Sequence, residues 1–157
     1  MNVQEIMTKN VYCIGLEDSL NAAAQLMWEH DCGSVPVIGD EKQVVGMITD
    51  RDIAMAAYIR GDRLEDIPIS SARSERLICC TVDDDIKDVQ QLMQAYQVHR
   101  IPVVDDSGEP LGIISINDIA CAYKGGTKGL QAKAISDTLA AICEPMKLTS
   151  SETAAAA

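Results

Sequence analysis

The amino-acid sequence predicts an α+β fold: two β-α-β-β-α repeats packed as a pseudo-twofold pair, followed by a C-terminal helix. The first observation behind this prediction is an internal repeat, because residues 35–52 are echoed by residues 101–118 at a constant offset of 66 positions. The second is a pair of closely spaced β-rich runs in each repeat. The third is a set of helix-capping residues ahead of segments with helical apolar spacing.

The two copies keep one register. Residues 18–54 and 84–120 are identical at 12 of 37 positions without a gap. Many other positions exchange similar residues, such as Val35 and Ile101. A unit of roughly 60 residues is only marginally stable alone, and a repeat that cannot bury its apolar face alone needs its neighbour. We therefore expect the two repeats to fold together as one pair.

The first repeat comprises residues 1–60. Asp18 and Ser19 offer an N-cap to a segment whose apolar residues have helical spacing. A Gly-Asp-Glu-Lys turn separates two β-rich runs, which is typical of a hairpin. The expected elements are a short strand at Val11–Ile14, a helix from Leu20 to His30, strands at Val35–Ile38 and Val44–Ile48, and a helix from Thr49 to about Arg60.

The second repeat, residues 69–123, follows a linker at residues 61–68 and is expected to have the same plan. Asp84 and Asp85 are expected to cap its first helix, which reaches Tyr96.

The remaining residues, 124–157, are expected to form a glycine-rich hinge, a helix from Leu130 to Cys143 and a frayed tail from Thr149 to Ala157. Pro145 should stop the helix. This helix packs either on its own chain or across a dimer; docking to another protein is the alternative.

The composition excludes several kinds of partner. A net charge of −11 and a pI near 4.4 argue against a surface for nucleic acid or an anionic membrane, because both require a basic surface. The longest apolar run, residues 53–59, is too short for a membrane helix. The chain start has no apolar signal core, so a cytoplasmic location is expected.

Reduced thiols are expected for the six cysteines, Cys13, Cys32, Cys79, Cys80, Cys121 and Cys143. None forms a Cys-x-x-Cys motif, and His30 and His99 lie at no metal-ligand spacing, so we expect no metal site. Redox sensing through Cys79 and Cys80 or through Cys13 is an alternative function.

The candidate binding residues follow the last strand of each repeat, as Thr49-x-x-Asp52 and Ser115-x-x-Asp118. A hydroxyl and the free backbone N–H groups at a helix start bind anions. A carboxylate three residues later can accept hydrogen bonds from both hydroxyls of a ribose. The pattern therefore suits a 5′-phosphorylated ribose. It is equally a helix capping box, which needs no ligand.

Two further candidates, His99 and Arg100, immediately precede the second hairpin, where the first repeat has Gly33 and Ser34. Arginine suits phosphate because its planar fork binds two oxygens at once. A solvated surface arginine is the alternative. Arg51, inside the first motif, could reach the same cleft. No catalytic constellation or Walker loop is visible.

With these motifs, the chain resembles the tandem CBS domain, or Bateman module. The likeness rests on the repeated apolar-Pro-Val and Gly-x-apolar-Thr/Ser-x-x-Asp patterns and on the Val-His-Arg-Ile-Pro-Val-Val run at residues 98–104. It covers nearly everything from Val3 to Tyr123. With its short C-terminal extension, the chain is similar to small stand-alone bacterial CBS-pair proteins, including the hypoxic-response type.

This resemblance implies a disc-like pair of repeats that joins a second pair as a homodimer. It also implies two clefts for an adenosine-containing ligand such as AMP, ADP, ATP or S-adenosylmethionine, each cleft taking its ribose-binding Asp from one repeat and its adenine contacts from the other. The roles carried over are ribose binding for Asp52 and Asp118, phosphate binding for Thr49, Ser115, His99 and Arg100, and an adenine pocket for Cys32, Gly33 and Ser34.

The two clefts are expected to be unequal. The family motif at residues 5–8 is replaced by Ser-Ala-Arg-Ser at residues 71–74, and the first repeat has no arginine equivalent to Arg100. One well-formed site is therefore predicted, in a non-catalytic module that needs no cofactor and signals through dimer geometry to a protein target in trans. In that case Asp118→Asn should abolish binding. The alternative is a ligand-free structural or stress-response interaction protein.

Overall fold

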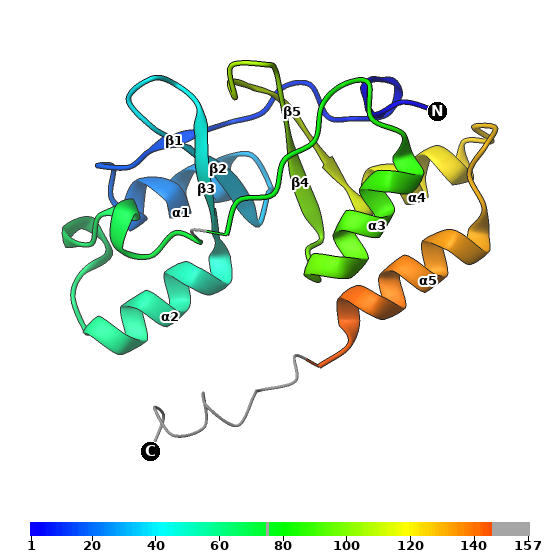
Figure 1. Cartoon of the computed structure of the whole chain (residues 1–157). Coiled ribbons are helices and arrows are strands. Elements are labelled where there is room, and N and C mark those ends of the chain that lie inside the picture. Colours follow the sequence, from blue (N-terminus) through cyan, green and yellow to red (C-terminus); the bar gives the residue numbers. More distant parts are fainter. Residues whose placement is uncertain (75, 146–157) are drawn as a thin grey trace.

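Two β-hairpins, each flanked by helices, lie side by side in the computed structural model, which describes residues 1–74 and 76–145 (Figure 1). The α+β fold with two repeats and a C-terminal helix is confirmed. In chain order the strands and α-helices are β1 (Ile14–Gly15), α1 (Leu20–Glu29), β2 (Ser34–Ile38), β3 (Val44–Thr49), α2 (Asp50–Arg60), α3 (Ile86–Tyr96), β4 (Arg100–Val104), β5 (Pro110–Ser115), α4 (Ile116–Lys124) and α5 (Ala132–Cys143).

The two sheets differ by one strand. In the first repeat β1 pairs in parallel with β2, which pairs antiparallel with β3. In the second repeat β4 and β5 form a two-stranded sheet, and among the described residues the equivalent of β1 is a single parallel bridge from Cys80 to Val103. Both repeats turn directly after this position: the backbone N–H of Gly15 donates to the Asp18 carboxylate, and that of Thr81 donates to the Asp84 carboxylate.

Most predicted helix starts agree with the structure. The Ser19 hydroxyl accepts from the backbone of Ala22 and the Asp85 carboxylate from that of Lys87, so each caps its helix. The C-terminal helix begins two residues later than predicted, at Ala132, without a side-chain cap. The predicted tail at residues 149–157 lies outside the described residues.

Each repeat has its own aliphatic core, in keeping with a chain that contains no Phe. Leu20, Met27 and Ile48 are buried in the first core, and their equivalents Ile86, Met93 and Ile114 are buried in the second. The repeat in the sequence is therefore a repeat in packing.

The residues that lead into each repeat pack on the other repeat. We call residues 3–8 and 69–74 the leading segments. Val3 is buried in the core of the second repeat, and Ile69 is buried in the core of the first. Figure 1 shows the N-terminus beside the second repeat, from which the chain crosses to the first. This exchange means that neither core is complete without residues from the other repeat.

Two glycines make room for the exchanged backbones. Thr8 pairs with Ile113, and Ser74 pairs with Met47. A Cβ atom at Gly112 in β5 would lie 2.6 Å from the carbonyl oxygen of Thr8. A Cβ atom at Gly46 in β3 would lie 2.5 Å from the carbonyl oxygen of Ser74. No side chain fits at these positions unless the leading segment moves.

Among the described residues, no helix is both long enough and apolar enough to span a membrane.

We expect Gly112→Ala to lower the free energy of unfolding by about 1–3 kcal/mol, because the new methyl group overlaps backbone that packing holds in place. Denaturant unfolding measures this change. Gly125→Ala is the matched control: its Cβ would meet no atom closer than 3.4 Å. Equal stability of the two variants would contradict the proposed fit.

Candidate functional site

A cavity of about 290 Å³ lies between the repeats, where β2 and β4 begin. We call it the Asp52 cleft. Polar residues from the first repeat meet cationic and apolar residues from the segment before α3 and from the turn into β4. Its lining residues are Ser34, Met47, Thr49, Asp52, Ser74, Arg76, Ile78, Gln97, Val98, His99, Arg100 and Pro102. The structure thus brings five of the predicted residues together: Ser34, Thr49, Asp52, His99 and Arg100.

Thr49 and Asp52 form a helix capping box at the start of α2. The Thr49 backbone N–H and hydroxyl donate to Oδ2 of Asp52 at 2.9 and 2.7 Å, and the Asp52 N–H donates to the Thr49 hydroxyl at 3.1 Å. No hydrogen bond from another described residue reaches Oδ1 of Asp52. The cap therefore uses only one carboxylate oxygen and leaves the other available to the cleft.

Ser115 and Asp118 form the same capping box at the start of α4. Here Oδ1 of Asp118 also accepts a hydrogen bond, from the hydroxyl of Thr8 at 3.2 Å. Both carboxylate oxygens are thus bonded within the chain, and neither Ser115 nor Asp118 lines the Asp52 cleft. The two carboxylates are chemically unequal although the sequence around them is repeated.

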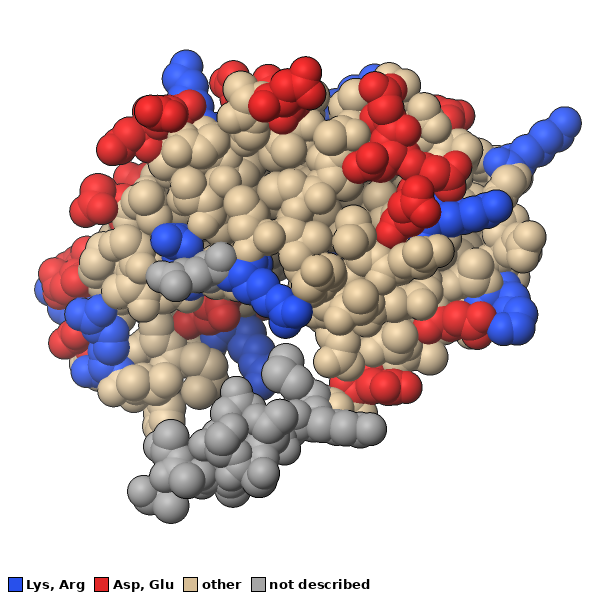
Figure 2. All heavy atoms as spheres, in the orientation of Figure 1, with Lys and Arg blue, Asp and Glu red and all other residues tan. Residues whose placement is uncertain are grey.

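The cations of the cleft come from the second repeat. Arg100 and His99 lead into β4, and Arg76 precedes α3 with its guanidinium carbon 4.6 Å from the centre of the Tyr96 ring. In Figure 2, Lys and Arg side chains gather beside the hollow between the two halves, while most of the acidic side chains in view lie nearer the periphery. Sequence reasoning missed Arg76. Its place in the cleft depends on where the second leading segment crosses to the first repeat, which local sequence patterns do not show.

Ser34 contributes an unpaired hydroxyl. This residue is only 6% exposed, and its Oγ has no hydrogen-bond partner among the described residues. A buried polar group without a partner costs about 1–3 kcal/mol, so such groups are rare in folded proteins. A ligand in the cleft can supply the missing partner.

Besides Ser115 and Asp118, three predicted residues lie outside the Asp52 cleft. Cys32 and Gly33 line a separate cavity of about 530 Å³ beside α1 and α2, which we call the α1/α2 groove. Arg51 is exposed on α2 and lines neither cavity. The single adenine pocket expected from residues 32–34 is therefore divided, with Ser34 alone in the Asp52 cleft.

All six cysteines are free thiols. Burial raises the pKa of Cys13 and Cys79. Burial, together with the nearby Asp84 carboxylate and Cys79, raises the pKa of Cys80 to about 12. Thiolate formation is therefore suppressed at all three positions, which disfavours redox sensing there. Within residues 1–74 and 76–145, no group of three or more His, Cys, Asp or Glu residues is arranged to hold a metal ion.

Two repeats, each with a hairpin between two helices, around a polar, partly cationic cleft define a tandem-repeat module. The family model of the CBS domain matches residues 3–58 and 65–125, and the chain belongs to the CBS domain family. The resemblance seen in the sequence is confirmed.

Among curated proteins, the chain is 33% identical to hypoxic response protein 1 of Mycobacterium tuberculosis over 147 residues, which cover 94% of this chain and 97% of the relative. A crystal structure of hypoxic response protein I with two coordinated zinc ions matches at a TM-score of 0.70 and 31% identity, over 77% of this chain and 98% of that one. The CBS domain pair of protein MJ0100, solved with 5′-methylthioadenosine and S-adenosylmethionine, matches at a TM-score of 0.72 and 25% identity, over 81% and 98% of the two chains.

Alkylation of the native protein should modify the exposed Cys121 and Cys143 quickly and Cys80 slowly, because reaction requires a thiolate that the alkylating reagent can reach. Peptide mass spectrometry at mildly alkaline pH measures the order of labelling. The unfolded chain is the control, in which all six thiols should react alike. Early labelling of Cys80 in the native protein would reopen the redox alternative.

Proposed function

We propose that this chain is a non-catalytic regulatory module that binds a phosphorylated adenosine ligand in the Asp52 cleft. The observation that carries the proposal is a set of unused polar groups around one cavity. Oδ1 of Asp52 and the buried hydroxyl of Ser34 have no partner among the described residues, and Arg100 lines the same cavity. A buried hydroxyl such as that of Ser34 is normally hydrogen-bonded.

Each part of the ligand has a complementary group. Oδ1 of Asp52 accepts hydrogen bonds from the ribose hydroxyls, as a carboxylate with a free oxygen can. Ile78, Val98 and Pro102 provide apolar surface for the adenine ring. The Thr49 hydroxyl and the first backbone N–H groups of α2 favour a phosphate, helped by the dipole of that helix.

The charge of the cleft favours phosphate over a cationic ligand. Two arginines, Arg76 and Arg100, face one carboxylate, Asp52, in a chain whose net charge is −11. Guanidinium groups form charge-assisted pairs with phosphate oxygens and repel the sulfonium of S-adenosylmethionine. The adenosine compounds bound by the MJ0100 CBS pair support the ligand class. We place AMP, ADP and ATP ahead of S-adenosylmethionine.

Such a module signals through a conformational change. A ligand shifts a conformational equilibrium only if it binds one state more tightly than the other. We propose that the chain works in the cytoplasm as a homodimer whose geometry depends on nucleotide occupancy, and that it acts on a protein target in trans. No cofactor is required.

A ligand-free interaction protein is the second candidate. One observation favours it: both Asp52 and Asp118 already serve as capping residues. In that case the carboxylates stabilise α2 and α4 and bind no ligand.

Asp52→Asn should abolish nucleotide binding, because the Thr49 donors hold the amide oxygen and leave the NH2 group, which cannot accept a hydrogen bond, facing the ribose. Asp118→Asn is the matched control and should bind like the wild type, since both oxygens of its carboxylate already accept hydrogen bonds, from Ser115 and Thr8. We therefore expect the decisive substitution to be at residue 52 rather than at residue 118. Calorimetric titration of the nucleotide-free protein with AMP, ADP, ATP, S-adenosylmethionine and NAD measures both. If none of these ligands binds, the result would favour the ligand-free interaction protein.

Arg100→Ala should weaken AMP binding roughly 10- to 100-fold, the loss expected when a hydrogen bond to a charged group is removed. Adenosine, which lacks the phosphate, should bind the variant and the wild type equally. The same titration therefore tests the phosphate role of Arg100. An equal loss for adenosine would instead give Arg100 a role in shaping the cleft.

A further inference from the structure

A carboxylate outside the Asp52 cleft lies close to one of the arginines inside it. Asp50, the first residue of α2, lines the α1/α2 groove, whereas Arg100 lines the cleft. A Cβ atom at Gly33 would lie 3.2 Å from Oδ2 of Asp50 and 4.0 Å from a terminal guanidinium nitrogen of Arg100. Because residue 33 is a glycine, no side chain occupies the point that the carboxylate and the guanidinium both approach.

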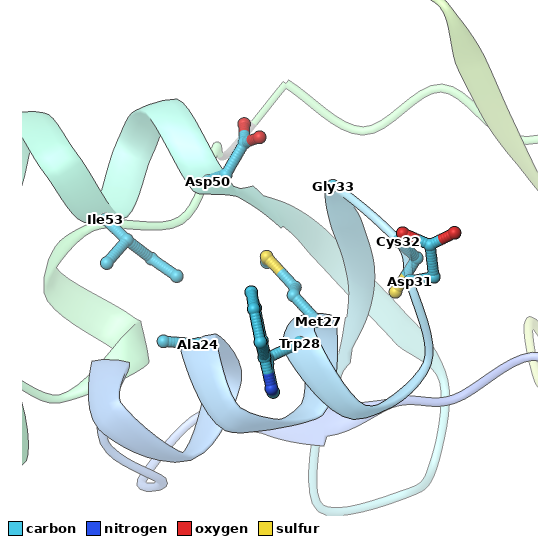
Figure 3. Close-up of a pocket in the computed structure, with 8 residues that line it drawn as sticks. All are labelled: Ala24, Met27, Trp28, Asp31, Cys32, Gly33, Asp50 and Ile53. Atoms are coloured by element: carbon cyan, nitrogen blue, oxygen red, sulfur yellow. The ribbon is translucent and has the colours of Figure 1, made fainter.

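The backbone at the start of α2 fixes the direction of the Asp50 side chain. Its Oδ1 accepts a hydrogen bond from the backbone N–H of Arg51 at 2.7 Å. The backbone N–H of Asp50 donates to the carbonyl oxygen of Gly33 at 3.1 Å. In Figure 3 the carboxylate points away from Met27 and Trp28, so it does not face the apolar part of the groove. Its second oxygen, Oδ2, lies toward Gly33.

Asp50 acts on Arg100 through its charge. In the part of the chain that the structure describes, no salt bridge joins the two side chains. Arg100 is therefore not held by Asp50. A charge nevertheless acts over a distance of about 10 Å at 0.1 M salt. The carboxylate offsets part of the attraction of Arg100 for a phosphate, and it also repels the phosphate itself.

The charges around the cleft are balanced once Asp50 is counted. Arg76 and Arg100 are the Lys or Arg side chains that line the cleft among the described residues, and Asp50 and Asp52 supply two carboxylates. A monophosphate ester carries a charge of about −1.5 to −2 at pH 7. Each further phosphate adds negative charge for which the cleft has no additional arginine or lysine.

The fold does not require a carboxylate at residue 50. The offset of 66 positions relates Asp50 to Ile116 and Arg100 to Ser34. Ile116 begins α4, where the same capping box forms without an acidic residue at this position. The carboxylate and the arginine therefore occur together at the Asp52 cleft, and neither has a charged counterpart in the other repeat.

We propose that Asp50 limits the phosphate charge that the Asp52 cleft accepts and makes the site select a nucleoside monophosphate over the diphosphate and the triphosphate. Asp50 is then a specificity-determining residue that acts on the phosphate chain and on Arg100 without lining the cleft. This selectivity rests on the proposed function, because it states which of the adenosine phosphates the cleft prefers.

Calorimetric titration of Asp50→Asn with adenosine, AMP and ATP in magnesium-free buffer tests the proposal. The amide oxygen can still accept the N–H of Arg51, so the substitution removes the charge and keeps the start of α2 intact. The wild type should bind AMP more tightly than ATP. The variant should bind AMP about threefold and ATP about tenfold more tightly than the wild type does, because repulsion grows with the charge of the ligand. Adenosine should bind both equally, and added salt should reduce the differences.

Asp106→Asn is the matched control, since Asp106 is exposed in the turn that follows β4, at the opposite end of that strand from Arg100. It makes the same change in net charge and should leave all three affinities unchanged. An equal gain in ATP affinity in this control would overturn the proposal, because the effect would then come from net charge alone.

Three further results would also overturn it: a wild type that binds ATP as tightly as AMP, an Asp50→Asn variant with unchanged or weaker ATP binding, and an equal gain for adenosine, which would indicate a change in the shape of the cleft. In each of these cases the wild type still binds nucleotide and the proposed function stands. A wild type that binds neither AMP nor ATP overturns the proposed function and this selectivity together.

Discussion

The exchange of the leading segments is the constraint on which the rest of the structure depends. Backbone from one repeat lies against a glycine in a strand of the other, closer than any side chain would permit. The pairing of Ser74 with Met47 places the following residues, including Arg76 and Ile78, over the first repeat, where they line the cleft. The contact that joins the two repeats thus also brings together residues far apart in the sequence.

The two repeats contain the same helix-capping motif, but the carboxylate of the motif has different hydrogen-bond partners in each repeat. In both repeats a hydroxyl and a carboxylate cap the helix after the last strand. Thr8 then bonds the second carboxylate, whereas its counterpart Ser74 lines the cleft beside the first. A single hydrogen bond, from Thr8, therefore distinguishes the Asp118 carboxylate, whose two oxygens are both bonded, from that of Asp52, whose Oδ1 has no partner among the described residues. The capping and ligand-binding interpretations of this motif are compatible at Asp52.

Patterns within one repeat could be predicted from the sequence, and contacts between repeats could not. Apolar spacing and caps indicated α1, α3 and the two hairpins, because these features are local. The division of residues 32–34 between two cavities, the bond from Thr8 to Asp118 and the place of Arg76 all depend on how the leading segments cross. The spacing of apolar residues along the sequence does not indicate such crossings. The sequence shows Gly46 and Gly112 as part of a repeated motif. That they make room for the backbone of the leading segments is seen only in the structure.

The position of α5 also removes the symmetry that the repeat would otherwise give the surface. Thr138 in α5 bonds Gln90 and Gln94 of α3, whereas their counterparts in α1, Ala24 and Trp28, line the open α1/α2 groove. The two halves of the chain therefore present different helical faces to their surroundings. A molecule that recognises one of these faces does not find a second copy of it on the other half.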